Sequence, residues 1–264
     1  MNTLLASRGS RFARLSRVAA AVAFCASGAG CSRDERGATS LRVLAAASLG
    51  DVVGELAAGS GEEEEVSAGA SGALRRQIEL GTGCDVFISA DPLHVDALIA
   101  SGLLLGDTRT VLARNRLVVV FHEGQSTDAV ARLMSPQCRR IAIGNPEYVP
   151  AGRYARQALE AAGVWEELQG KLVLTDDVRQ AAAHVALGTV DAAVVYQSDA
   201  VQLEKCVAAE LPDAAHQPIM YVGAVHRAAA DPDRASAFLR RIAADEAAAI
   251  WRKHGFIPVV GGSP

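Results

Sequence analysis

Aromatic side chains are scarce in this 264-residue chain: they make up 5% of the residues, whereas 50% of the residues are hydrophobic. A chain of this length and apolar content buries a substantial core, either as one large domain or as two smaller lobes. With so few rings available, most of that core must consist of Ala, Val, Leu and Ile.

Positive charge is scarce as well. The formal net charge at pH 7 is −4, and no run of Lys and Arg occurs after residue 40. Because a nucleic-acid-binding domain usually presents a basic face, we expect no nucleic-acid partner.

The motifs that mark several enzyme classes are absent. The chain has no G-x-x-x-x-G-K-[ST], no G-x-G-x-x-G, no H-E-x-x-H and no G-x-S-x-G. Its six His are scattered without ligand spacing, and its five Cys form no C-x-x-C. We therefore expect a protein that is not an enzyme and has no cofactor and no bare metal cation. Free buried thiols are the simpler interpretation of the Cys, although one disulfide stays open.

The first 30 residues have the pattern of an export signal. Arg8, Arg11, Arg14 and Arg17 precede an apolar stretch that begins at 18–24 and fades into small residues. That stretch is too short for a membrane-spanning helix. Removal of residues 1–30 would remove four Arg and no acid, which lowers the formal net charge from −4 to −8.

The small residues before Cys31 resemble a bacterial lipoprotein cleavage site, although Gly28 stands where such sites carry a bulky aliphatic residue. Cys31 is then a lipid anchor, and the polar residues 31–40 are a tether to a membrane surface. Ordinary cleavage near 26–29, with Cys31 incidental, is the alternative.

From residue 41 onward, short apolar segments alternate with helical ones. Strands are predicted at 41–46, 85–89, 116–121, 140–143, 192–196 and 219–225; helices at 49–58, 73–80, 92–101, 153–162 and 178–187, with 231–254 largely helical. The acidic run at 62–65 is interpreted as a solvated turn. This alternation predicts an α/β fold with mostly parallel sheets flanked by helices.

No Pro- or Gly-rich linker separates two halves of the chain, so two lobes would share it discontinuously. The apolar strands at 116–121 and 219–225 are placed as crossovers between lobes. We predict lobe one at 41–121 and 220–264, and lobe two at 122–219.

Small or polar residues stand at several predicted helix starts. Ser48 and Ser71 each precede a helical segment, Ala151 follows a Pro suited to a first helical turn, and Val178 follows an Asp pair. A helix start offers unpaired N–H groups and the positive end of the helix dipole. Each position taken alone is explained by a plain N-cap. Several such ends converging on one cleft would bind an anion.

Five segments together resemble the molybdate-binding proteins of ABC transporters. They are AAASL at 45–49, ASGALRRQIELG at 70–81, CDVFISAD at 84–91, GNPEYVPAGRYARQAL at 144–159 and DDVRQAAAHVALGTVDAAVVYQSDA at 176–200. Their order and spacing cover nearly all of 41–256, which makes the resemblance specific.

The resemblance implies a type II periplasmic-binding fold with an oxyanion between two α/β lobes. In the matching positions, Ser48 and Ser71 would donate through hydroxyl and backbone N–H groups. Ala151 and Val178 would donate through backbone N–H groups, and Tyr196 through its hydroxyl. Gly72 and Ala73 replace hydroxyl residues common after the second serine, which leaves that loop with fewer donors; Cys84 also departs from the pattern, without consequence for the site.

A set of donors without a carboxylate suits a fully deprotonated dianion, because a protonated oxyanion needs an acceptor for its O–H group. We therefore expect an exported, monomeric binding protein that delivers molybdate or tungstate to an ABC permease, in the periplasm or at an extracytoplasmic membrane surface. Sulfate is the alternative ligand. A ligand-sensing domain of a transcription regulator is the alternative class, and the export signal argues against it.

Overall fold

The computed structural model describes residues 40–59, 61, 63–123, 128–203 and 206–259. The predicted signal peptide, Cys31 and nearly all of the predicted tether lie outside these ranges. None of the helices within them is long and apolar enough to cross a membrane.

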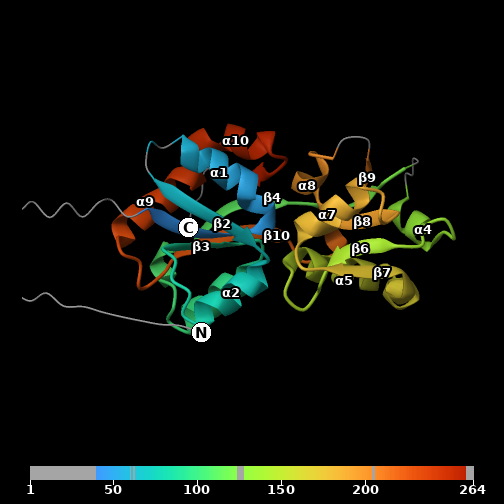
Figure 1. Cartoon of the computed structure of the whole chain (residues 1–264), viewed down its shortest axis with the longest axis horizontal. Helices are drawn as coiled ribbons and strands as arrows, with labels where there is room; N and C mark the ends of the chain where they lie inside the picture. Colours follow the sequence, from blue (N-terminus) through green and yellow to red (C-terminus); the bar gives the residue numbers. More distant parts are fainter. Residues whose placement is uncertain (1–39, 60, 62, 124–127, 204–205, 260–264) are drawn as a thin grey trace, which may run out of the picture. The chain divides into compact units, whose positions relative to one another are not determined.

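A six-stranded mixed sheet, with the order β11-β4-β10-β3-β1-β2, forms the first half of the fold (Figure 1). Strand β1 pairs in parallel with β2 and β3, and each antiparallel pair involves β4 or β10. The strands are β1 (Leu41–Ala46), β2 (Glu64–Gly69), β3 (Val86–Ser89), β4 (Thr110–Asn115), β10 (Ile219–Val225) and β11 (Ile257–Pro258).

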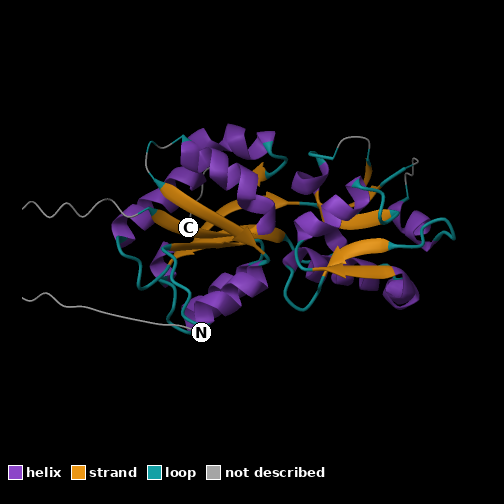
Figure 2. Cartoon of the chain, viewed as in Figure 1, coloured by secondary structure: helices purple, strands orange, loops and turns teal. Residues whose placement is uncertain are grey.

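A five-stranded sheet, with the order β7-β6-β8-β5-β9, forms the second half. Strand β6 pairs in parallel with β7 and β8, whereas β5 pairs antiparallel with β8 and β9. The strands are β5 (Leu117–Phe121), β6 (Ile141–Gly144), β7 (Leu172–Thr175), β8 (Ala192–Tyr196) and β9 (Val207–Glu210). The two mixed sheets flanked by helices (Figure 2) are the predicted α/β class.

The chain passes from the first sheet to the second within one residue. Strand β4 ends at Asn115 and β5 begins at Leu117, so that Arg116 alone lies between strands of different sheets. The return passage leads from β9 to β10. The sequence placed 116–121 in lobe one, whereas the pairing of β5 puts 117–121 in the second sheet.

Helices cover both faces of the first sheet. Side chains of α2 and α3 pack on one face together with Phe87 and Val222, while α1, α9 and α10 belong to the core of the other face. The main helices are α1 (Gly50–Ala58), α2 (Ser71–Glu79), α3 (Pro92–Ala100), α4 (Ala129–Met134), α5 (Pro150–Ala161), α6 (Trp165–Leu168), α7 (Val178–Ala186), α8 (Gln197–Ala200), α9 (Pro232–Ala243) and α10 (Ala248–Lys253). The C-terminal helices therefore return to the sheet in which the described chain begins.

The second half of the acidic run, Glu64 and Glu65, is a strand and not a turn, which corrects the sequence interpretation for these residues. Residues Glu64–Gly69 form β2, the edge strand that pairs with β1 along its whole length. The Glu64 side chain is buried and forms an ion pair of 2.6 Å with Arg241 of α9. Backbone pairing and this partner together offset the low strand propensity of glutamate, and charged side chains are common on edge strands.

The Cys residues of the described chain are free. Cys84 and Cys138 are buried and Cys206 is half-buried, and none forms a disulfide. Burial raises the pKa of Cys84 to about 12, so its side chain stays a neutral thiol. The preferred interpretation of free thiols is confirmed for these three residues.

Helix α5 begins unusually close to the end of β6. A Cβ atom added to Gly152 would lie 1.8 Å from the backbone oxygen of Gly144, so no side chain fits there. The glycine thus lets the first turn of α5 approach the carboxyl end of β6. This approach fixes where the N–H groups of that turn point.

We expect Gly152→Ala to lower the free energy of unfolding by about 1–3 kcal/mol or more, because the helix must shift away from the strand. Gly170→Ala is the matched control, since its added Cβ would meet no atom within 4 Å. Urea denaturation of both variants measures the difference. Equal stability of the two variants would show that the contact does not constrain α5.

Candidate functional site

A small cavity lies where the ends of several strands and the starts of several helices meet. Its free volume is about 10 Å³, roughly the space that one water molecule needs. Its lining residues are Ala46, Ala47, Ser48, Gly69, Ala70, Ser71, Ala90, Val149, Pro150, Ala151, Asp177, Val178 and Tyr196. All five residues selected from the sequence therefore line the same cavity.

The first sheet contributes two serines from the carboxyl ends of adjacent parallel strands. Ser48 lies in a 3-10 turn, Ala47–Leu49, that connects β1 to α1. Ser71 is the first residue of α2, two residues after β2 ends. Because β1 and β2 run parallel, their carboxyl ends share one edge of the sheet, and both serines reach the same cavity.

The second sheet contributes two helix starts. Ala151 follows Pro150, the first residue of α5, and Val178 is the first residue of α7. Neither backbone N–H has a hydrogen-bond partner within the described chain, as expected for the first turn of a helix. The two N–H groups and the two helix dipoles favour negative charge in the cavity.

Tyr196 ends β8 and is 1% exposed. Its hydroxyl is buried and has no hydrogen-bond partner among the described residues. Burial raises the pKa of Tyr196 well above its ordinary value, so the hydroxyl stays protonated and is a donor. The side chain of Asp199 accepts a hydrogen bond of 3.4 Å from the backbone N–H of Tyr196 and so fixes the turn from which the ring projects.

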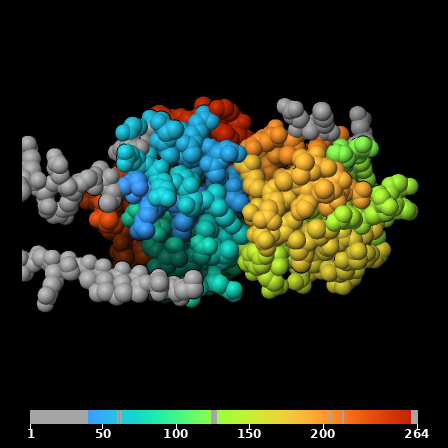
Figure 3. Space-filling model, in the orientation of Figure 1, coloured from blue at the N-terminus to red at the C-terminus, as the bar shows by residue number. Residues whose placement is uncertain are grey.

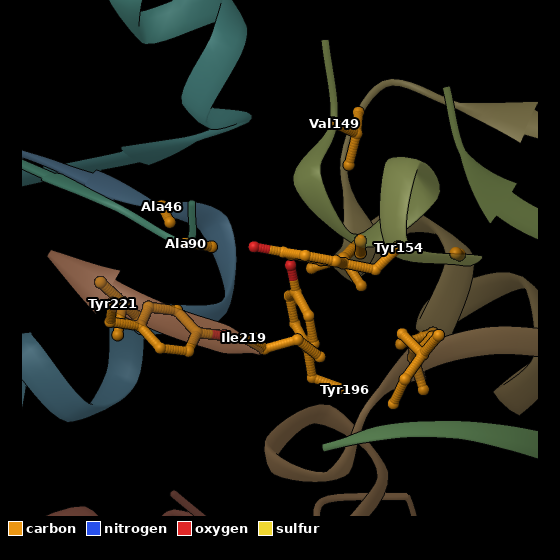
Figure 4. Packing of buried hydrophobic residues seen from close by; sticks show 14 of the residues in the cluster. Ala46, Ala90, Val149, Tyr154, Tyr196, Ile219 and Tyr221 are labelled. Carbon is orange, nitrogen blue, oxygen red and sulfur yellow. The ribbon is translucent and has the colours of Figure 1, made fainter. Parts of the chain in front are cut away.

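The two serine hydroxyls each have a protein partner. Ser48 Oγ lies 3.0 Å from the hydroxyl of Tyr221, on β10. Ser71 Oγ accepts a hydrogen bond of 3.1 Å from the backbone N–H of Ala90. In Figure 4 the hydroxyl of Tyr154 points toward Ala90, and the hydroxyl of Tyr196 points toward the same region. Hydroxyl groups thus lie around a cavity whose lining is mostly apolar.

Sequence reasoning missed three residues next to this site: Tyr221, Asn115 and Tyr154. Each is buried, and Asn115 Nδ2 donates to the hydroxyl of Tyr221 at 3.1 Å. Tyr221 lies in an apolar strand that the sequence marked only as a crossover. The available signal was a tyrosine within a buried strand, because a buried tyrosine hydroxyl usually has a hydrogen-bond partner.

One carboxylate, that of Asp177, lines the cavity. Its Oδ1 accepts from the backbone N–H of Gln180 at 2.9 Å and its Oδ2 from the side chain of Gln180 at 3.3 Å. Asp177 is therefore the N-cap of α7, as the sequence predicted. Both of its oxygens are engaged at the helix start.

Two arginines next to the cavity join the two sheets. Arg153 of α5 forms an ion pair with Asp91, the N-cap of α3. Arg179 of α7 forms an ion pair of 2.8 Å with Asp51 of α1 and contacts the backbone oxygen of Ser48 at 3.4 Å. In Figure 3 the blue and teal surface of the first sheet meets the yellow surface of the second along a seam.

A larger hollow lies beside α2, and its lining includes the charged side chains of Arg75, Arg76 and Glu79. It contains none of the five predicted residues. Across the described ranges, no group of three His, Cys, Asp or Glu residues is placed to bind a metal ion. The small cavity is therefore the candidate site.

A family model for bacterial extracellular solute-binding proteins matches residues 41–257. The chain is 31% identical to the putative ABC transporter substrate-binding lipoprotein YvgL of Bacillus subtilis, over 89% of this chain and 92% of that protein. It is 35% identical to the molybdate-binding protein ModA of Escherichia coli, over 82% of this chain and 88% of ModA.

The fold has a solved counterpart in the periplasmic molybdate-binding protein of Azotobacter vinelandii. The TM-score is 0.76 at 26% identity, and the match covers 83% of this chain and all of that structure, at 100%. The chain therefore belongs to the bacterial extracellular solute-binding proteins, in the family that includes the molybdate-binding proteins of ABC transporters.

Proposed function

We infer that this protein captures molybdate or tungstate in the cavity and delivers the oxyanion to an ABC permease. The observation that carries this inference is the buried, unpartnered hydroxyl of Tyr196, which faces a cavity with the N–H groups of Ala151 and Val178. Relatives with 35% and 26% identity are molybdate-binding proteins. No catalytic activity and no cofactor is proposed.

The donor set determines the class of ligand. Three hydroxyls and two backbone N–H groups face the cavity, and the carboxylate of Asp177 is engaged with Gln180. A tetrahedral dianion without a proton matches such a set, because each of its oxygens accepts. Sulfate also meets this requirement and is the alternative ligand, distinguished by its smaller size.

We propose that ligand binding and closure of two lobes are coupled. The lobes correspond to the two sheets. The chain crosses from lobe one to lobe two at Arg116 rather than after 121, and it returns to lobe one before β10. The Arg153–Asp91 and Arg179–Asp51 pairs connect the lobes in the closed form. Hinge motion at two short passages would separate the serines from the helix starts of the second sheet.

Export and anchoring complete the proposal. We place the monomeric protein in the periplasm or on an extracytoplasmic membrane surface, after removal of residues 1–30. A relative at 31% identity is described as a lipoprotein. Cys31 would then bear the lipid and residues 31–40 would be the tether.

Calorimetric titration of the purified protein with molybdate, tungstate, sulfate and phosphate tests the ligand. We expect tight binding of molybdate and tungstate, weaker binding of sulfate and none of phosphate near neutral pH, because phosphate then carries a proton. Tight binding of sulfate alone would select the alternative. No binding of any of these anions would contradict the proposed function.

The hydroxyl donors are tested by Ser48→Ala, Ser71→Ala and Tyr196→Phe. Each removes one donor to a charged acceptor, which typically costs about 1.5–3 kcal/mol, so molybdate affinity should fall about ten- to a hundredfold. Val178→Ala is the matched control because its backbone N–H remains. If the hydroxyls served only the fold, stability would fall by about 1 kcal/mol with little change in affinity.

Asp199 has an unusual environment next to Tyr196. Its carboxylate is fully buried, and Arg179 Nε lies 3.0 Å from Oδ1 without the alignment of a hydrogen bond. Burial raises the pKa of Asp199 to about 7, although the charge of Arg179 opposes this shift. The folded protein therefore keeps this proton at pH values where the unfolded chain has lost it.

From this shift we expect the free energy of unfolding to fall as pH rises from about 4 to about 7, since the native state binds the extra proton in that window. Asp199→Asn removes the contribution, so its stability relative to the parent should increase across the window and level off above it. Urea denaturation at several pH values measures this. Parallel pH profiles for the two proteins would contradict the assignment.

Intact mass of protein extracted from bacterial membranes tests the anchor. We expect a mature N-terminus at Cys31 with an added acyl mass, and a soluble product from Cys31→Ala. A soluble parent protein with an unmodified N-terminus near Ala29 would show ordinary cleavage instead.

A further inference from the structure

A buried chain of hydrogen bonds leads from the passage between the sheets to the cavity. Asn115, the last residue of β4, donates through Nδ2 to the hydroxyl of Tyr221 at 3.1 Å. The hydroxyl of Tyr221 lies 3.0 Å from Ser48 Oγ. All three side chains are buried, with exposed fractions of 6%, 0% and 1% for Asn115, Tyr221 and Ser48.

The orientation of the Asn115 amide is fixed by its other contacts. Its Oδ1 accepts from the backbone N–H of Arg116 at 2.9 Å, and a backbone N–H can only donate. The NH₂ group must therefore face Ser198 Oγ, at 2.9 Å, and the hydroxyl of Tyr221. Asn115 is a donor to Tyr221.

This orientation determines the direction of the next bond. Because the oxygen of Tyr221 accepts from Asn115, its own proton needs an acceptor, and within the described chain Ser48 Oγ is the partner in reach. In the opposite direction the phenolic proton would be buried without an acceptor, at a cost of about 1–3 kcal/mol. Burial also raises the pKa of Tyr221, so its proton is retained.

Ser48 consequently accepts from Tyr221 with one of its two lone pairs, and its own proton remains available to donate into the cavity. Ser71 is arranged in the same way, since its Oγ accepts from the backbone N–H of Ala90. Tyr196 has no partner among the described residues and is free to donate. Each hydroxyl of the site can thus donate to a ligand.

We propose that Asn115 and Tyr221 are specificity-determining positioning residues, which occupy one lone pair of Ser48 Oγ and so favour donation by Ser48 to the ligand over acceptance from an oxyanion that carries a proton. Neither residue lines the cavity. The proposal rests on the proposed function, because it assigns the hydrogen-bond polarity of the same site. Without the bond from Tyr221, Ser48 Oγ has both lone pairs free and accepts more readily from a ligand O–H group.

Three anions of equal charge test the proposal by competition at pH 8. Molybdate is the reference ligand, hydrogen arsenate carries one proton, and selenate is a fully deprotonated anion close to arsenate in size. The comparison of arsenate with selenate separates recognition of the proton from the volume of the cavity. The readout is the ratio of the two dissociation constants in each variant.

Tyr221→Phe removes the donor to Ser48 and keeps the ring, which packs edge-on against Tyr196 and Phe256. Asn115→Asp is nearly isosteric and reverses the chain, because an ionised carboxylate accepts from Tyr221, which can then accept from Ser48. We expect both variants to raise arsenate affinity relative to selenate by about tenfold or more, the equivalent of one satisfied buried group.

Ser198→Ala is the matched control. It removes the other acceptor of Asn115 and perturbs the same buried cluster, but leaves the Asn115–Tyr221–Ser48 connection in place. We expect lower stability and an unchanged arsenate-to-selenate ratio. A purely structural role for the cluster would instead make the three variants behave alike.

The outcomes distinguish failure of the proposed function from failure of the role assigned to Asn115 and Tyr221. A parent that binds neither molybdate nor the other anions contradicts the proposed function. The role of Asn115 and Tyr221 is overturned if the parent binds molybdate but the variants gain affinity equally for arsenate and selenate. It is also overturned if arsenate fails to compete in the variants. An arsenate gain confined to Tyr221→Phe and Asn115→Asp supports it.

Discussion

The site depends on buried hydrogen-bond donors that lack an acceptor within the described protein. An unsatisfied buried donor costs about 1–3 kcal/mol, and Tyr196 and the N–H groups of Ala151 and Val178 are of this kind. An anion that accepts from all of them recovers this free energy. The fold supplies such donors without breaking other hydrogen bonds, because first-turn N–H groups are unpaired in any helix. The strands of each parallel pair also end at one edge of their sheet, which brings the donors together.

The sequence therefore predicts the parts of the site that follow from strand–helix alternation. Tyr196 ends a predicted strand, and Ser71 and Val178 lie at the starts of predicted helices. Local pattern is enough to place such residues at strand ends and helix starts. Their convergence was implied only by the family resemblance, because no local pattern specifies which edges face each other.

Residues that act through tertiary contacts were not predictable in this way. Ser48 and Tyr221 are separated by 173 positions, and Asn115 and Tyr221 by 106. Strand β2 was missed for a related reason: the buried position of Glu64 depends on Arg241, 177 positions away. In each case a local propensity is outweighed by a partner that only the folded chain supplies.

The proposed dianion site lies beside arginines that already have carboxylate partners. Arg153 pairs with Asp91 and Arg179 with Asp51, so neither contributes an unpaired charge to the cavity. Attraction then comes from helix ends and oriented hydroxyls, whose dipoles act only at short range. Because Ser48 and Ser71 belong to one sheet and Ala151 and Val178 to the other, separation of the lobes would disperse these dipoles at once. Because the dipoles come from two lobes and no counter-charge on one lobe holds the anion, closed lobes would bind it tightly and separated lobes would release it to a permease.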